Sequence, residues 1–171
     1  MLFTSRPTLP EPFSHVVERK PFNRIDRKRP ALELESGNWL LLARQGPCVI
    51  SETDAQFISY WHEIQQAKWD GETKTLSIDW VDPTREPITM AAKAEEPHEF
   101  MMSMQEYVEY VVVSSGQRVA DNGTTITASI RRREDGELFS ALVADGPLDE
   151  QGEELAHQLE RRLREGVGLD Y

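Results

Sequence analysis

Two short turn signals, each followed by a stretch of alternating apolar and polar residues, constrain the fold of this chain most strongly. Asp70-Gly71 precedes residues 76–80, in which leucine, isoleucine and tryptophan occupy every second position. Asn122-Gly123 precedes residues 125–133, which alternate in the same way. Asn-Gly and Asp-Gly tolerate the positive φ angles of hairpin turns. Strands that are joined by short turns pair antiparallel, so we expect antiparallel rather than parallel sheets.

Two other stretches have helical spacing. Residues 97–112 follow two glutamates and open on a proline, which favours a helix start, and their apolar residues recur every three or four positions. After Pro147, an acidic first turn leads into Leu155, Leu159 and Leu163, and arginines follow near the end. This charge order suits the helix dipole. Helices that follow antiparallel strands predict an α+β fold with a mid-chain helix and a C-terminal helix.

The charge is distributed unevenly along the chain. Residues 1–30 hold five prolines and seven basic against three acidic side chains, whereas residues 31–171 hold 27 acidic and 12 basic ones. Proline-rich, aperiodic sequence predicts an extended or disordered basic tail. We therefore expect a tail over 1–30 and a single α+β domain over 31–171, with a subdivision near residue 115 as the alternative.

The basic tail allows three interpretations. Arg19-Lys20 and Arg27-Lys28-Arg29 are candidate contacts to a partner, to nucleic acid or to an anionic lipid surface. Phe13 and Phe22 are candidate anchors on a protein partner. We favour a third interpretation, in which the tail lies across the acidic body of its own chain or of a second subunit, because this needs no further partner.

The run His62-Glu63-Ile64-Gln65-Gln66 lies one residue from a zinc-protease signature. That signature needs a second histidine at the position of Gln66, and histidines four residues apart must share a helical face. The surrounding sequence is strand-like instead, so we interpret His62 and Glu63 as partly exposed scaffold residues. Trp61, Ile64, Ala67 and Trp69 are the expected core contacts, and their spacing predicts a turn or bulge at the start of this strand.

No catalytic constellation, cofactor motif or metal-ligand spacing is recognisable. The one cysteine, Cys48, follows Gly-Pro at a strand start and is expected in the core. Arg131 and Arg133 would share a strand face and are candidates for gripping an anion. The alternative, which we favour, is that they pair with nearby glutamates such as Glu134 and Glu137.

Part of this pattern resembles a known family. The residues that carry the resemblance are Trp39-Leu40-Leu41, Trp61, Ile64, Ala67, Trp69-Asp70 and the closing stretch Arg131 to Arg164. Together they resemble an actinobacterial family of small proteins with a bacterial PH-like domain. The resemblance implies an antiparallel curved sheet, or PH-like roll, packed by helices. It implies no activity.

These observations predict a non-enzymatic PH-like module that binds a protein partner or itself. The alternative is a small-molecule binder or small enzyme with an anion site near Arg131 and Arg133. The longest apolar run, Trp39 to Ala43, is far shorter than the ~18 residues of a membrane span. A single cysteine and the lack of a signal-peptide pattern at the N-terminus favour a cytoplasmic location.

Overall fold

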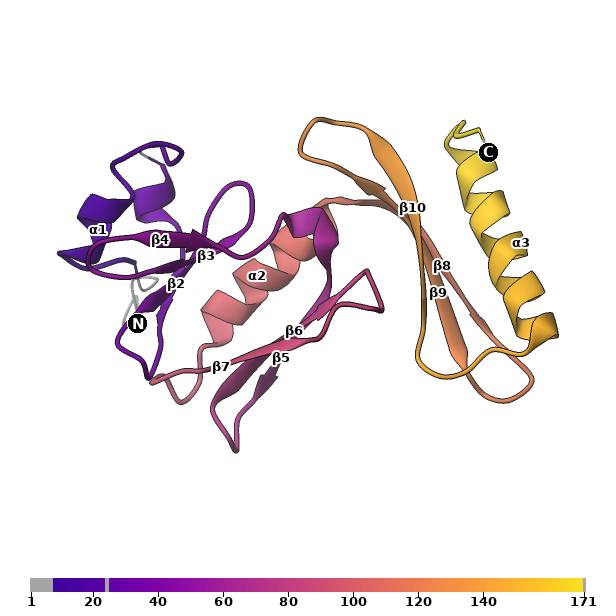
Figure 1. Cartoon of the computed structure of the whole chain (residues 1–171), viewed down its shortest axis with the longest axis horizontal. Helices are drawn as coiled ribbons and strands as arrows, with labels where there is room; N and C mark the ends of the chain where they lie inside the picture. The colour runs from indigo at the N-terminus through magenta and orange to yellow at the C-terminus, as the bar shows by residue number, and fades with distance from the viewer. Residues whose placement is uncertain (1–7, 24, 171) are drawn as a thin grey trace, which may run out of the picture. The chain divides into compact units, whose positions relative to one another are not determined.

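The computed structural model describes residues 8–23 and 25–170. Its elements, in chain order, are α1 (Phe13–Val16), η1 (Asp26–Lys28), β1 (Ala31–Glu33), β2 (Trp39–Leu42), β3 (Pro47–Ile50), β4 (Ala55–Phe57), η2 (Trp61–Glu63), β5 (Ile64–Asp70), β6 (Thr75–Trp80), β7 (Ile88–Ala91), α2 (His98–Tyr110), β8 (Val112–Val119), β9 (Thr125–Arg132), β10 (Leu138–Ala144) and α3 (Glu150–Gly166). Figure 1 shows their arrangement. They form two compact units. The first contains the described residues up to Trp80 and Glu86–Val108, and the second contains Val81–Arg85 and the described residues from Glu109 onward.

The first unit begins with a four-stranded antiparallel sheet in the order β1-β2-β3-β4. Strands β2 and β3 form a hairpin around Gln45-Gly46-Pro47, with Leu41 opposite Cys48. Both side chains are buried, together with Ile50 and Ala43. Because alternate residues point to one face, Leu41, Ala43, Cys48 and Ile50 share one face of the sheet and pack in one core cluster.

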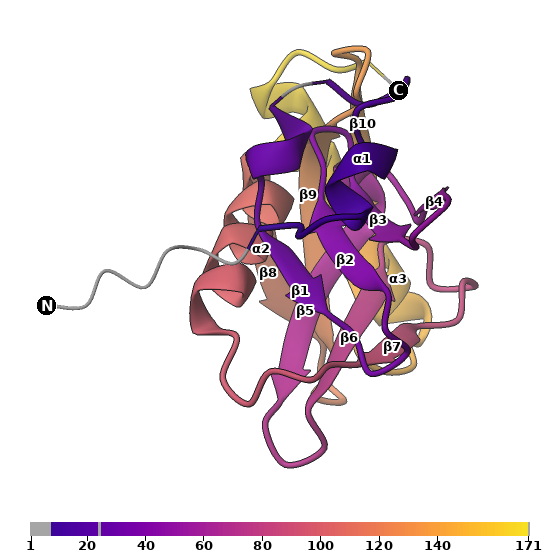
Figure 2. The ribbon, with the colours of Figure 1, turned by 90° about the vertical axis from the view of Figure 1, so that its left-hand side faces the viewer.

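Residues 8–23 and 25–30 differ from the extended or disordered tail expected from their composition. They form α1 and η1, and both views place α1 beside the first sheet (Figures 1 and 2). Val17 is fully buried, and Phe13 and Phe22 pack against the core that includes Leu41 and Cys48. The described part of this segment thus lies on its own body through apolar contacts. Composition alone misled here because scattered apolar residues need no period when they pack from a loop.

The second sheet of this unit has the order β5-β6-β7. Leu76, Ile78 and Trp80 on β6 are buried, as their alternation predicts. A bulge separates Ile64 from Gln66, and η2 precedes it, so the predicted turn or bulge is confirmed. Ala67 and Trp69, expected in the core, are only half-buried.

Helix α2 buries Phe100, Met104 and Val108, which lie four residues apart on one face. The neighbouring Tyr107 ring packs on the indole of Trp61, with ring centroids 5.2 Å apart. The amphipathic pattern of residues 97–112 therefore predicted this helix correctly.

The second unit is a three-stranded antiparallel sheet in the order β10-β9-β8, covered by α3 (Figure 1). Ile126 and Ala128 pack against Ala156 and Leu159 of the helix. The polar stretch Ser114-Ser115-Gly116, which looks like a connection between elements, is part of strand β8. Its α3-facing position Gly116 leaves room for Leu159, since a Cβ there would lie 3.2 Å from the leucine Cδ1.

The α+β prediction is confirmed, with a mid-chain and a C-terminal helix, but the strands form three antiparallel sheets. Among the described residues, no helix combines the length and the apolar character needed to cross a membrane.

Candidate functional site

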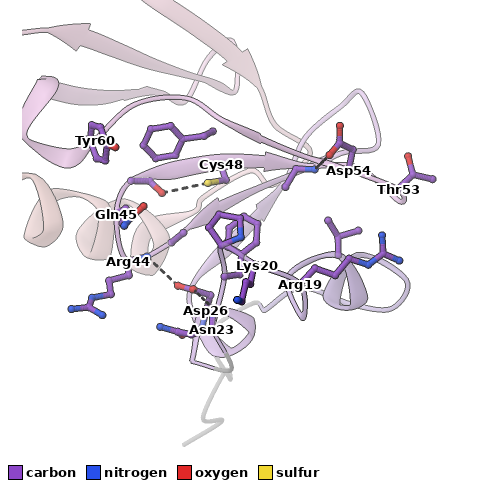
Figure 3. Close-up of a pocket in the computed structure, with 17 residues that line it drawn as sticks. Arg19, Lys20, Asn23, Asp26, Arg44, Gln45, Cys48, Thr53, Asp54 and Tyr60 are labelled. Carbon is purple, nitrogen blue, oxygen red and sulfur yellow. Dashed lines mark hydrogen bonds between the residues drawn. The ribbon is translucent and has the colours of Figure 1, made fainter. Parts of the chain in front are cut away.

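A pocket of about 470 Å³ lies in the first unit, on the face of the first sheet that carries Cys48 and Phe57 (Figure 3). Its volume is in the usual range of ligand sites, about 300–1,000 Å³. Three stretches of the chain contribute to it. The lining residues are Val16, Arg19 to Asn23, Asp26, Ala43 to Gly46, Cys48, Thr53 to Ala55, Phe57 and Tyr60.

The buried carboxylate of Asp26 forms part of the pocket lining. It accepts the backbone N–H of Asn23 at 2.9 Å and that of Arg44 at 3.1 Å (Figure 3). The Nε atom of Arg29 lies 3.3 Å from the same carboxylate. A buried carboxylate is stable only when such donors compensate its charge. Asp26 therefore joins the η1 segment to the end of β2, and its charge is neutralised by Arg29.

Three exposed cations, Arg19, Lys20 and Arg44, line the same pocket. Within the described part of the chain, none of them lies within ion-pair distance of a carboxylate. Five other described basic residues of this unit, Arg27, Arg29, Lys68, Lys74 and Lys93, each have a carboxylate partner, for example Lys93 with Glu33 at 2.8 Å. The one exposed acid that lines the pocket, Asp54, already accepts the backbone N–H of Ala55 at 2.8 Å. The pocket lining thus holds three cations against the two carboxylates of Asp26 and Asp54, a formal net charge of +1, although the chain as a whole is acidic.

Aromatic side chains form another part of the pocket. The ring of Phe57, which is 46% exposed, meets the ring of Tyr60 edge-on at 5.0 Å. Tyr60 in turn stacks on His62 at 5.3 Å. Figure 3 shows Tyr60 across the pocket from Arg19. An aromatic surface opposite cations can bind a ligand that has both an apolar and an anionic part.

The thiol of Cys48 is buried at the pocket and donates to the backbone carbonyl of Gly46 at 3.7 Å. Burial, reinforced by the negative charge of Asp26, raises the pKa of Cys48 to about 12. Because the thiolate is the nucleophile, a thiol that stays protonated near neutral pH is chemically inert. The expectation of Cys48 as a core residue is confirmed by its 2% exposure.

The loop between β2 and β3 is held closely against residues 59–61. A Cβ atom on Gly46 would lie 1.7 Å from the backbone oxygen of Ser59, so only glycine fits at this position. The Trp61 backbone N–H donates to the Gln45 carbonyl at 3.2 Å. This side of the pocket is therefore preorganised by backbone contacts.

The structure places the three basic candidates at 27–29 outside the pocket lining. Arg27 pairs with Glu18 at 3.0 Å on the surface, and Lys28 is exposed on η1. Arg29 serves the buried carboxylate of Asp26, and its guanidinium lies 5.4 Å from the centre of the Tyr107 ring. Arg27 and Arg29 thus have internal partners.

Arg131 and Arg133 occupy different environments in the second unit. Arg131 lies on β9 with 3% exposure, and its Nε donates to Ser129 Oγ at 3.0 Å. Burial lowers the pKa of Arg131 to about 10. Arg133 lies beyond the end of β9, with its guanidinium 4.3 Å from the centre of the Phe139 ring. In this structure the buried Arg131 is inaccessible to an anion in solvent.

His62 and Glu63 are parts of the scaffold around η2. His62 is buried rather than partly exposed, and Glu63 accepts the backbone N–H of Tyr60 at 2.7 Å, which caps η2. Among the residues that the structure describes, no three His, Cys, Asp or Glu side chains converge as metal ligands.

Comparisons with protein-family models, with curated proteins and with solved structures found no match to this chain. The resemblance to small PH-like proteins therefore stays a prediction.

Sequence reasoning identified Arg19 and Lys20 as basic residues of a tail but gave no reason to place Arg44 beside them. The only available signal was that residues 1–30 are basic in an acidic chain. The pocket arises because Asp26 binds the Arg44 backbone, a contact between residues 18 positions apart.

Proposed function

We propose that this protein is a non-enzymatic binding module that recognises an anionic group in the pocket shown in Figure 3. The observation that carries the proposal is that Arg19, Lys20 and Arg44 all line one pocket and that none of them has a paired carboxylate among the described residues. An anionic ligand would supply the missing opposite charge.

The chemistry of the pocket supports binding rather than catalysis. The Cys48 thiol is held in its neutral form. The buried carboxylate of Asp26 has its charge satisfied by two backbone donors and by Arg29, so it is poorly suited to act as a general base. A pocket with fixed charges and no activated group can hold a ligand without transforming it.

The aromatic surface supports an apolar contact next to the anion. Phe57 remains nearly half exposed, beside Tyr60, in a position where a ligand would cover it. Arginine and aromatic side chains are also the residue types that dominate binding energy at interfaces. Both observations are compatible with the PH-like interaction module predicted from the sequence.

The proposal is tested by titrating the ¹⁵N-labelled full chain with citrate and with sulfate at constant ionic strength. We expect amide shifts to concentrate at residues 19–26, 43–48 and 53–60 and to saturate. Each pocket cation contributes a charge-assisted contact, so Arg44→Gln should weaken binding at least ~5-fold.

Lys28→Gln is the matched control, because Lys28 is an exposed cation near the pocket that does not line it. It should leave the citrate affinity unchanged. Shifts scattered over all basic side chains, or equal effects of the two substitutions, would show general charge attraction instead of a site.

A further inference from the structure

We infer that the anionic group is an acidic side chain of an extended peptide, which binds by adding a strand to the open edge of β4. This inference rests on the proposed function and specifies its ligand. It follows from the hydrogen-bonding pattern of β4, the side chains around the pocket and the charge of the rest of the chain.

Strand β4 is the last strand of its sheet, so one side of its backbone faces no other described strand. Its hairpin with β3 has hydrogen bonds from Ser51 N–H to the Asp54 carbonyl at 2.8 Å and from Ile58 N–H to the Pro47 carbonyl at 3.0 Å. Antiparallel pairs alternate between bonded and non-bonded positions. The N–H and C=O groups of Ala55 and Phe57 therefore point away from β3.

One of these four outward-pointing backbone groups already has a partner within β4 and its preceding turn. The Ala55 N–H is already bound to the Asp54 carboxylate. The N–H and C=O of Phe57 and the C=O of Ala55 have no strand beside them among the described strands. These groups are a template for an added strand, as in other cases of peptide recognition at sheet edges.

The side chains of an added strand would alternate between the two faces of the sheet. Residues that lie directly opposite one another in a sheet project to the same face. The Phe57 side chain lines the pocket, so the peptide residue opposite it would also face the pocket. Residues two positions before and after would do the same. Every second side chain of the peptide can thus reach the region of Arg19, Lys20 and Arg44 or the ring of Phe57.

The side chains of the pocket favour one class of ligand. The pocket cations favour acidic side chains, and exposed Phe57 favours an apolar neighbour. A long polyphosphate chain would be repelled by residues 31–171, which hold 27 acidic and 12 basic side chains. A short peptide with alternating acidic and apolar residues meets the local charge without extending across the acidic surface.

Selection from a random decapeptide library displayed on phage, with the full-length chain as bait, tests this inference. We expect enriched peptides with Asp or Glu at alternating positions and apolar residues among them. A selected peptide should lose at least ~10-fold in affinity for Arg19→Gln/Lys20→Gln and retain its affinity for Lys28→Gln.

Backbone pairing is tested separately by N-methylating one peptide amide at a time. Methylation at the residue opposite Phe57 should reduce affinity ~10-fold. Methylation at the residues immediately before and after it should have little effect, because their N–H groups would point away from β4. On the protein, Phe57→Pro removes the outward N–H, and Phe57→Val retains it while also losing the ring. The proline variant should bind clearly more weakly, and the methylation scan gives the same answer if that variant fails to fold.

Peptides without acidic residues, or a flat methylation scan, would overturn the inference. If citrate binds at the pocket but no peptide is enriched, the peptide inference fails and the proposed anion site stands. If neither citrate nor any peptide depends on Arg19, Lys20 and Arg44, both fail.

Discussion

The indole N–H of Trp61 donates to the backbone carbonyl of Ala43 at 3.0 Å, which joins the η2 segment to the end of β2. Both residues are buried, and Ala43 also lines the pocket. Trp61, which directly precedes His62-Glu63, thus has a structural role, because it holds the end of β2 next to Arg44.

Trp61→Phe should lower the free energy of unfolding by about 1–3 kcal/mol, because it leaves the buried Ala43 carbonyl without its donor. Urea denaturation followed by far-UV circular dichroism measures the change. Trp69→Phe is the control, since Trp69 is only half-buried on β5. Equal losses for the two variants would contradict the importance of the Trp61 hydrogen bond.

Gly46→Ala should destabilise the protein by about 3 kcal/mol or more, because the new methyl group would overlap the Ser59 carbonyl and overpacking forces the backbone to move. The thermal midpoint and the citrate affinity should fall together. Gly71→Ala should be nearly neutral, as its Cβ would lie 3.8 Å from the nearest atom, a Trp69 nitrogen. A stable Gly46→Ala variant with intact citrate binding would refute the close approach of the two segments.

Asp26→Asn should cost about 2–3 kcal/mol of stability, because an amide cannot replace a carboxylate that accepts two backbone donors and faces Arg29. Asp79→Asn is the matched control. Asp79 pairs with Lys68 at 3.4 Å on the surface, where ion pairs contribute less than about 1 kcal/mol. Urea midpoints that shift equally would show that Asp26 is not held as the structure describes.

Cys48 should react slowly with iodoacetamide at pH 8.5 in the folded protein and rapidly in urea. Burial raises the pKa of Cys48 from a usual 9.0 to about 12, so the folded chain keeps its proton where the unfolded chain loses it. The folded state therefore binds more protons between pH 9 and 12, and this group's contribution to stability should decline as the pH rises through that range. Cys48→Ala should remove this contribution to the pH dependence. Fast alkylation of the folded protein would contradict the burial.

Local sequence patterns predicted the hairpins and helices well. The leucines at 155, 159 and 163, whose spacing predicted a helix, belong to α3. Asn122-Gly123 forms the turn between β8 and β9, with Gly123 at a φ of +86°. Each of these predictions depends on residues close together in sequence, where alternation, helical spacing or turn chemistry is sufficient.

Two edge strands, β4 and β8, have little sequence signal of their own. Residues 55–57 of β4 are too few to establish a period, and Ser114-Ser115-Gly116 of β8 looks like a polar connection. Edge strands have a free side and need no continuous apolar face, so their sequences are polar and irregular. Their existence depends on a neighbouring strand that supplies hydrogen bonds, which the local sequence does not report.

The sequence by itself determined the α+β class, the antiparallel hairpins, the core position of Cys48 and the basic character of the first thirty residues. Only the tertiary structure decided that residues 8–23 and 25–30 fold onto the first sheet, that Arg131 is buried and that Arg44 joins Arg19 and Lys20 in lining one pocket. The reason is physical. Hairpins, turns and helices follow from interactions between near neighbours in the chain. Burial and the pocket depend on contacts such as Asp26 with Arg44 and Trp61 with Ala43, each between residues 18 positions apart.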